Sequence, residues 1–113
     1  MTDPVVVRHG DVTVVQLTGD IDLATAEAAQ RAVLAHTGDG PAMVVDLTEV
    51  SFMDSAGVRM LDNVVAECTQ GDVRLQIVAP PDSPVRFTLF ICSFREDLLS
   101  GGVPEAVTRL TAS

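Results

Sequence analysis

One segment of the chain, residues 43–68, constrains the fold more than any other. It begins with an apolar stretch, Met43–Val45, that is typical of a buried strand, and it passes through an acidic turn at residues 54–57. Beyond the turn, apolar residues recur at intervals of three and four, as on one face of an α-helix. These residues are Val58, Leu61, Val65 and Cys68. The segment therefore predicts a strand that leads through a short turn into a helix.

The turn, Asp-Ser-Ala-Gly, places Ser55 at or beside the first position of that helix. The first N–H groups of a helix have no partner within it and carry a partial positive charge, so a helix N-terminus binds anions such as a phosphoryl group. Asp and Ser are also favoured helix caps, and Gly permits close packing, so most tetrapeptides of this kind are purely structural. Taken alone, the turn leaves a structural role favoured over a functional one.

Composition predicts a single α/β domain over residues 1–113, since 47% of the residues are apolar and the length suffices for a core. No apolar run approaches the roughly 18 residues of a spanning helix, and no signal-peptide pattern begins the chain, so we expect a soluble, cytoplasmic protein. The formal net charge of −9 argues against nucleic-acid binding and favours a partner with a basic surface.

The residues that most often bind metals or cofactors give no such signal here. Cys68 and Cys92 lie in apolar helical contexts, which favours buried free thiols over a redox pair or metal ligands. His9 and His36 are isolated and predicted to face solvent. We therefore expect neither a metal site nor a cofactor.

The remaining elements follow from apolar runs and turn residues. Two strands around residues 9–11 suggest a hairpin, and 18–22 is a predicted loop in which Asp22 or Thr25 caps the next helix. Ser83 and Pro84 are a favourable N-cap and first residue for a later helix. The expected strands are residues 4–7, 12–17, 43–45, 73–78 and, more weakly, 98–99. The expected helices are residues 23–35, the one that follows the turn, 84–92 and 104–110.

The order is β-β-α-β-α-β-α-(β)-α, which predicts a mixed, mostly parallel sheet with helices packed on one side. The third helix is apolar on two sides. Val85, Leu89 and Cys92 share one face, whereas Phe87, Phe90 and Phe94 share the other. Such a helix either has both faces buried or uses one face to bind a partner. An aromatic stripe favours the first interpretation, in which the phenylalanines belong to the core.

Four segments carry a resemblance to a known family. They are LTGDID at 17–22, VVDL at 44–47, VSFMDSAG at 50–57 and the third-helix region at 85–99. In this order they resemble the STAS domains of bacterial anti-sigma factor antagonists. Relatives commonly end the third helix with a turn glycine, where this chain has Ser93 and Phe94.

The resemblance implies a regulatory binding protein and not an enzyme. It implies that an anti-sigma factor, itself a serine kinase, phosphorylates Ser55, that a serine phosphatase reverses this, and that binding of the unmodified protein frees a sigma factor. Ala56 stands where many relatives have a second hydroxyl, so Ser55 is unambiguous. The implied partner-binding residues are Asp20, Asp22, Asp54, Ser55, Ala56, Gly57, Val58 and Arg59.

Asp20, Asp22 and Asp54 also have a structural interpretation as turn formers and caps. The structural and functional interpretations weigh equally for Asp20, whereas the functional one is favoured for Asp22 and Asp54. The alternative function is a STAS accessory subunit of a transporter or of a larger signalling assembly. We expect no nucleic acid and no membrane as partners, and either a monomer or a weak homodimer. An enzyme has little support, because no His or Cys is placed to activate Ser55.

Overall fold

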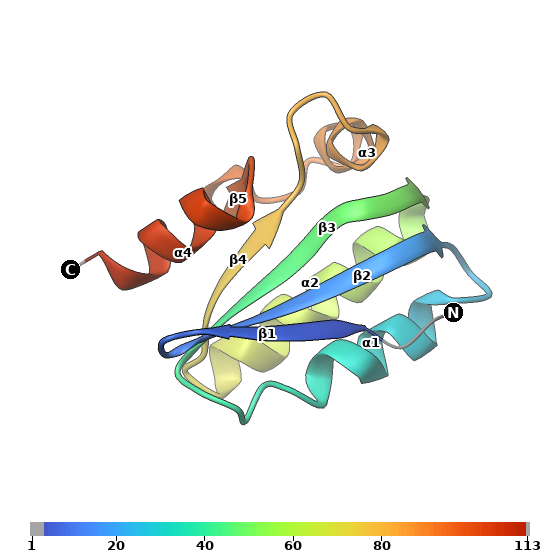
Figure 1. Ribbon diagram of the computed structural model, residues 1–113. Helices are drawn as coiled ribbons and strands as arrows, with labels where there is room; N and C mark the ends of the chain where they lie inside the picture. Colours follow the sequence, from blue (N-terminus) through green and yellow to red (C-terminus); the bar gives the residue numbers. More distant parts are fainter. Residues whose placement is uncertain (1–3, 113) are drawn as a thin grey trace.

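Five strands form one sheet in the computed structural model, which describes residues 4–112 (Figure 1). The strands lie in the order β1-β2-β3-β4-β5. β1 pairs with β2 antiparallel, and every later pair is parallel. The predicted mixed, mostly parallel sheet is thus confirmed. The strand bounds are β1 Val5–His9, β2 Val12–Ile21, β3 Ala42–Met53, β4 Arg74–Val78 and β5 Leu99–Ser100.

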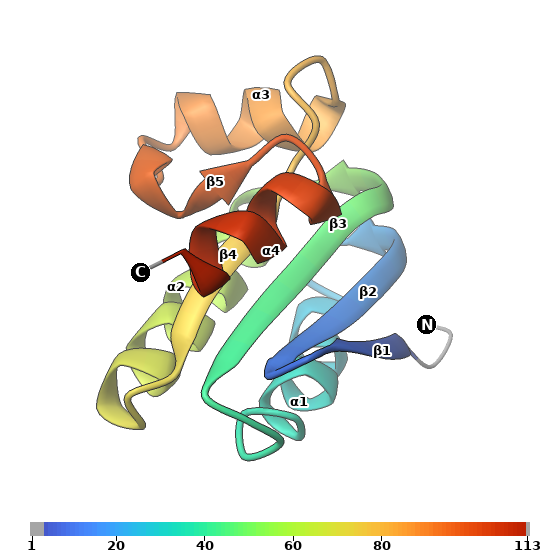
Figure 2. The ribbon, with the colours of Figure 1, turned by 60° about the vertical axis from the view of Figure 1, so that its left-hand side comes forward.

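Four α-helices and one short 3-10 helix connect or follow these strands within the described residues. Their bounds are α1 Ala26–Leu34, α2 Ser55–Gln70, α3 Pro84–Ile91, η1 Glu96–Leu98 and α4 Val103–Thr111. The predicted element order is correct, including the short strand before the last helix. α1 and α2 lie on one face of the sheet, whereas α4 lies on the other (Figures 1 and 2).

The prediction that the helices pack on one side is therefore wrong for α4. Strand residues alternate between the two faces of a sheet, and β3 is apolar on both. Met43 and Val45 belong to the main core with α1 and α2, whereas Val44 packs with Ala106 and Leu110 of α4. A continuous apolar strand needs cover on both faces, and α4 provides the second cover.

β2 and β3 are longer than predicted, and this positions the functional turn. The predicted loop at 18–22 is wrong through Ile21, because these residues pair with β3 across two register shifts. Gly19 has φ of +82°, a conformation that glycine adopts without strain and that suits an irregular strand. The extended pairing places Asp20 opposite Phe52 and Ile21 opposite Met53.

The start of α3 agrees with prediction, since Ser83 Oγ accepts a hydrogen bond from Arg86 N at 3.2 Å and Pro84 is the first helical residue. Its end explains the missing glycine. Ser93 has φ of +55°, its N–H donates to Phe90 O, and Phe94 N–H donates to Leu89 O. This is the Schellman arrangement, with a serine in the left-handed position that glycine usually takes.

The reversal at Ser93 separates the three phenylalanines of the stripe. Phe94 follows the turn and enters the core, with 7% of its surface exposed. Phe87 and Phe90 remain on the outer side of α3, 67% and 68% exposed, so the prediction of an aromatic core stripe is wrong for these two. Cys92, at the helix end, is also exposed, whereas Cys68 is a buried free thiol as predicted.

Candidate functional site

The ends of β2 and β3 lie side by side and hold the acidic turn. Asp54 N–H donates to Ile21 O at 3.3 Å, which joins the start of α2 to the end of β2. The Asp54 side chain caps α2, because its Oδ1 accepts from Ala56 N at 2.9 Å. Ser55 is the first residue of α2 and is exposed. A phosphoryl group on this hydroxyl would lie at the positive end of the helix.

The two aspartates of β2 and its following turn have structural partners of their own. Asp22 Oδ1 accepts from Ala24 N at 3.0 Å and from Thr25 N at 3.2 Å, so it closes the turn that leads into α1. Thr25 occupies the N-cap position but makes no side-chain cap bond. Asp20 Oδ1 accepts from Ser51 Oγ at 2.8 Å and is exposed.

Three carboxylates therefore lie around the turn, Asp22 and Asp54 held by local hydrogen bonds and Asp20 by a bond across the strands to Ser51. Within residues 4–112, no ion pair joins any of them to a basic side chain. Like charges add to one another's field, so these three carboxylates make the turn acidic before modification, while the exposed Arg59 lies one helical turn from Ser55.

Gly57 allows the start of α2 to approach the strands this closely. A methyl group at Gly57 would overlap Met53 Cγ and lie 3.0 Å from Ile21 O. Gly57 and Val58 are both buried in the free protein, and their assignment as partner contacts stays a prediction. Arg59 is exposed and Ala56 is half-buried, so both stay in the candidate surface.

Sequence reasoning missed two exposed apolar residues beside the turn. Leu23, 83% exposed, borders a groove of about 290 Å³ between α1 and α2, and Arg59 and Ala56 line the same groove. Phe52 is 49% exposed, because strand alternation turns it away from the buried Met53. The alternation around Met53 could have revealed Phe52, whereas Leu23 gave no signal within its predicted helix.

Neither histidine of the chain lies at the turn. His9 pairs with Val12 in the β1–β2 hairpin, and His36 Nδ1 lies 2.7 Å from Asp39 Oδ2 in the segment after α1. Both histidines are thus at the opposite end of the strands from Ser55. In the described part of the chain, no cluster of three or more His, Cys, Asp or Glu side chains could hold a metal ion.

The family model of the STAS domain matches residues 3–106. The chain belongs to the STAS domain family. None of the helices in residues 4–112 has the length and apolar character that crossing a membrane requires. The resemblance to bacterial anti-sigma factor antagonists, inferred from the four sequence segments, is confirmed by the relatives of this STAS domain.

Among these relatives is the anti-sigma-F factor antagonist RsfB of Mycobacterium tuberculosis, which is 40% identical over 57 residues. That match covers 50% of this chain and 47% of RsfB, so the chain spans about half the length of the curated relative. An anti-sigma factor antagonist from Mycobacterium paratuberculosis has a solved structure with a TM-score of 0.75 and 30% identity. The match covers 94% of this chain and 91% of the chain in that structure.

The fold is also that of SpoIIAA, an anti-sigma factor antagonist of Bacillus. Its unphosphorylated form has a TM-score of 0.69 at 19% identity, covering 97% of this chain and 99% of its own. Its phosphorylated form has a TM-score of 0.70 at 21% identity, covering 95% and 98%. At these identities the likeness shows the shared fold.

Proposed function

We propose that this STAS domain is an anti-sigma factor antagonist that is switched at Ser55. It binds an anti-sigma factor serine kinase and so releases a sigma factor, and phosphorylation of Ser55 by that kinase ends the binding. One observation carries the proposal: Ser55 is an exposed hydroxyl at the first position of α2, within the acidic turn that follows β3. Relatives that are anti-sigma factor antagonists support it. We also propose a serine phosphatase as the restoring partner, a cytoplasmic location, and residues 1–113 as the extent of the domain.

Local electrostatics suffice for the switch. Phosphate adds about −1.5 to −2 charges at neutral pH. The N-terminus of α2 accommodates that charge, whereas Asp20, Asp22 and Asp54 oppose it. A partner surface that fits a small hydroxyl and faces these carboxylates would meet a larger, doubly charged group. Loss of binding then follows from steric exclusion and from the cost of desolvating the phosphate.

The proposed switch requires no refolding of the domain. Asp54 already satisfies the N–H of Ala56, and Ser55 points into solvent, so a phosphate adds to the turn without displacing a buried group. The phosphorylated and unphosphorylated forms of SpoIIAA share this same fold, which supports the argument.

A binding role is favoured over catalysis. An acidic surface disfavours the serine alkoxide that a nucleophilic mechanism needs, and no histidine lies near the turn. The acidic composition, with a formal charge of −9, suits attraction to a basic docking surface on the kinase.

The test is to incubate the purified protein with its anti-sigma factor kinase and ATP, and then to measure intact mass and map the modified peptide. We expect one phosphate, on Ser55, and none in Ser55→Ala. Ser51→Ala is the matched control, because Ser51 is an exposed neighbouring hydroxyl, and it should still be phosphorylated. Stoichiometric phosphate on another residue, or on Ser55→Ala, would contradict the proposal.

A further inference from the structure

Exposed large apolar side chains occur on several elements in the described residues. Three lie on the edge strand β1: Val5, Val6 and Val7. The others are Leu23, Phe52, Phe87, Phe90 and Ile91. Leu23 and Phe52 flank the acidic turn, and the other three form the outer side of α3, which we call the α3 patch. The core does not need this patch, because Val85 and Leu89 anchor α3 and are fully buried.

α3 is tied directly to the strand that precedes Ser55. Thr88 Oγ1 donates to Met53 O at 3.1 Å, and Met53 is the residue against which Gly57 packs. The α3 patch and the start of α2 therefore hold fixed positions relative to each other. α3 and the start of α2 both lie near the end of the molecule where β2 and β3 finish (Figure 1). A partner that covers Ser55 therefore lies close to α3.

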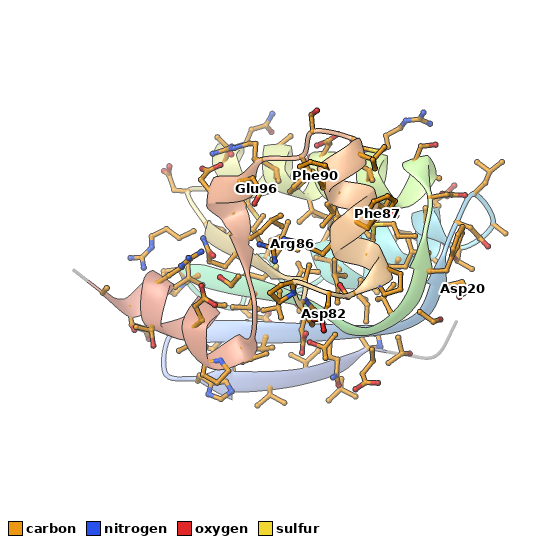
Figure 3. All side chains as sticks on the ribbon, turned by 90° about the horizontal axis from the view of Figure 1, so that it is seen from above. Asp20, Asp82, Arg86, Phe87, Phe90 and Glu96 are labelled. Carbon is orange, nitrogen blue, oxygen red and sulfur yellow. The ribbon has the colours of Figure 1, made fainter. Side chains whose placement is uncertain are left out.

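The α3 patch borders a groove with an exposed acidic residue in its lining. A groove of about 320 Å³ is lined by Pro81, Arg86, Phe87, Phe90 and Glu96, and Figure 3 shows Arg86 between α3 and the segment that carries Glu96. The Arg86 guanidinium makes contacts within the molecule. Its Nη1 donates to Ala79 O, its Nη2 lies 3.8 Å from Glu96 Oε2, and only 23% of its side chain is exposed.

The more exposed charged side chain of the groove lining is consequently the acidic one. Glu96, with 65% of its side chain exposed, lines the groove with the two phenylalanine rings (Figure 3), and the exposed Asp82 follows Pro81, which also lines it. Aromatic faces attract Lys and Arg cations, and acidic neighbours strengthen that preference. The surface thus fits an apolar segment that is flanked by basic side chains.

We propose that the α3 patch is a second docking surface for the same kinase that binds at Ser55, and that it receives an apolar, basic-flanked segment of that kinase. This inference rests on the proposed function. A second copy of this chain fits less well, because a two-fold contact would bring Glu96 and Asp82 toward the same acidic residues of the other copy, on chains that each carry a formal charge of −9.

With two docking surfaces, phosphorylation of Ser55 acts on only one of the two contacts with the kinase. Phosphorylation opposes contact at the turn and leaves contact at the α3 patch intact. Substitutions in the patch and at Ser55 should therefore act independently on the binding free energy, as separated sites generally do. Loss of the patch should weaken binding of the unmodified and the Ser55→Glu proteins by the same factor.

The probe is the purified anti-sigma factor kinase that phosphorylates the wild-type protein at Ser55. Calorimetry compares the wild type, Phe90→Ser and Phe87→Ser, with Val6→Ser as the matched control, since Val6 is an exposed apolar residue on β1. We expect at least a tenfold loss of affinity for each Phe variant and less than twofold for the control. The KM for phosphorylation should rise in the Phe variants with little change in kcat, because the patch does not touch the reacting hydroxyl.

Cys92 gives a second measurement that needs no substitution. It is exposed and follows the patch directly, whereas Cys68 is buried. Bound kinase should slow the reaction of Cys92 with a maleimide at least fivefold, and unchanged reactivity in a saturated complex would count against the patch.

The outcomes separate the two proposals. Unchanged affinity in the Phe variants, with phosphorylation of Ser55 intact, would overturn the second docking surface and leave the proposed function standing. A wild-type dimer that Phe90→Ser dissociates would assign the patch to self-association and also overturn this inference. A protein that the kinase neither binds nor phosphorylates at Ser55 would remove the proposed function, and this inference with it.

Discussion

Replacing Gly57 with alanine tests whether close packing fixes the functional turn. The new methyl would overlap Met53 Cγ and lie 3.0 Å from Ile21 O, and both neighbours are buried. Met53 cannot swing away cheaply, because its Cγ is near the base of a side chain that is 2% exposed. The start of α2 must move outward or the core beneath it must shift.

The magnitude follows from two opposing effects. Overpacking a filled core costs about 1–3 kcal/mol. Alanine is favoured over glycine within a helix by at most about 1 kcal/mol. We therefore expect Gly57→Ala to lower the free energy of unfolding by about 1–2 kcal/mol. The matched control is Gly71→Ala at the other end of α2, where a methyl would be 3.5 Å from the nearest atom and φ is −91°.

Urea unfolding followed by circular dichroism measures both variants. With a slope of about 2 kcal/mol per molar urea, the middle of the typical range, Gly57→Ala should lower the midpoint by roughly 0.5–1 M. Gly71→Ala should leave the free energy of unfolding unchanged or raise it by up to about 1 kcal/mol, because alanine restricts the unfolded chain. Its midpoint should therefore equal or exceed that of the wild type. A midpoint for Gly57→Ala equal to or above that of the wild type would refute the packing argument.

Three further predictions concern α3 and the thiols. Ser93→Gly should stabilise the protein by about 1 kcal/mol, because φ at Ser93 is +55°; a lower urea midpoint would contradict the helix-end geometry. Phe94→Ala should cost about 3–5 kcal/mol and Phe90→Ser less than about 0.5 kcal/mol, and melts that rank them in reverse would contradict their placement. Ellman's reagent should titrate one thiol, Cys92, in the native protein and two in urea, because Cys68 is buried. Burial, and to a smaller extent the charge of Glu67, raises the pKa of the Cys68 thiol. Two thiols that react rapidly in the native protein would contradict this.

Local chemistry in the sequence predicts the start of each functional element well. Ser83 caps α3 as expected, and Asp54 caps α2 according to the structural alternative, because a capping side chain needs only the N–H groups two or three residues ahead of it. The exposed Ser55 at the first position of α2 follows from the same local rule.

Features that depend on contacts between distant residues are harder to predict from the sequence. The length of β2 depends on pairing with β3, so Asp20 and Ile21 join the strand although their own sequence suggests a loop. The packing of α4 on the second face depends on how Val44 alternates within the assembled sheet. The burial of Phe94 depends on a left-handed Ser93, a conformation that favours glycine, so a helical projection placed it with Phe87.

The most direct test of the central claim is the affinity of the kinase for the protein with and without charge at position 55. Calorimetry should show that Ser55→Ala binds like the wild type and that Ser55→Glu binds at least tenfold more weakly, or about 1.4 kcal/mol. Thr69→Glu adds the same charge near the far end of α2 and should change affinity little, and binding of the wild type should weaken as salt rises. Equal affinities for Ser55→Ala and Ser55→Glu would contradict a switch at this residue.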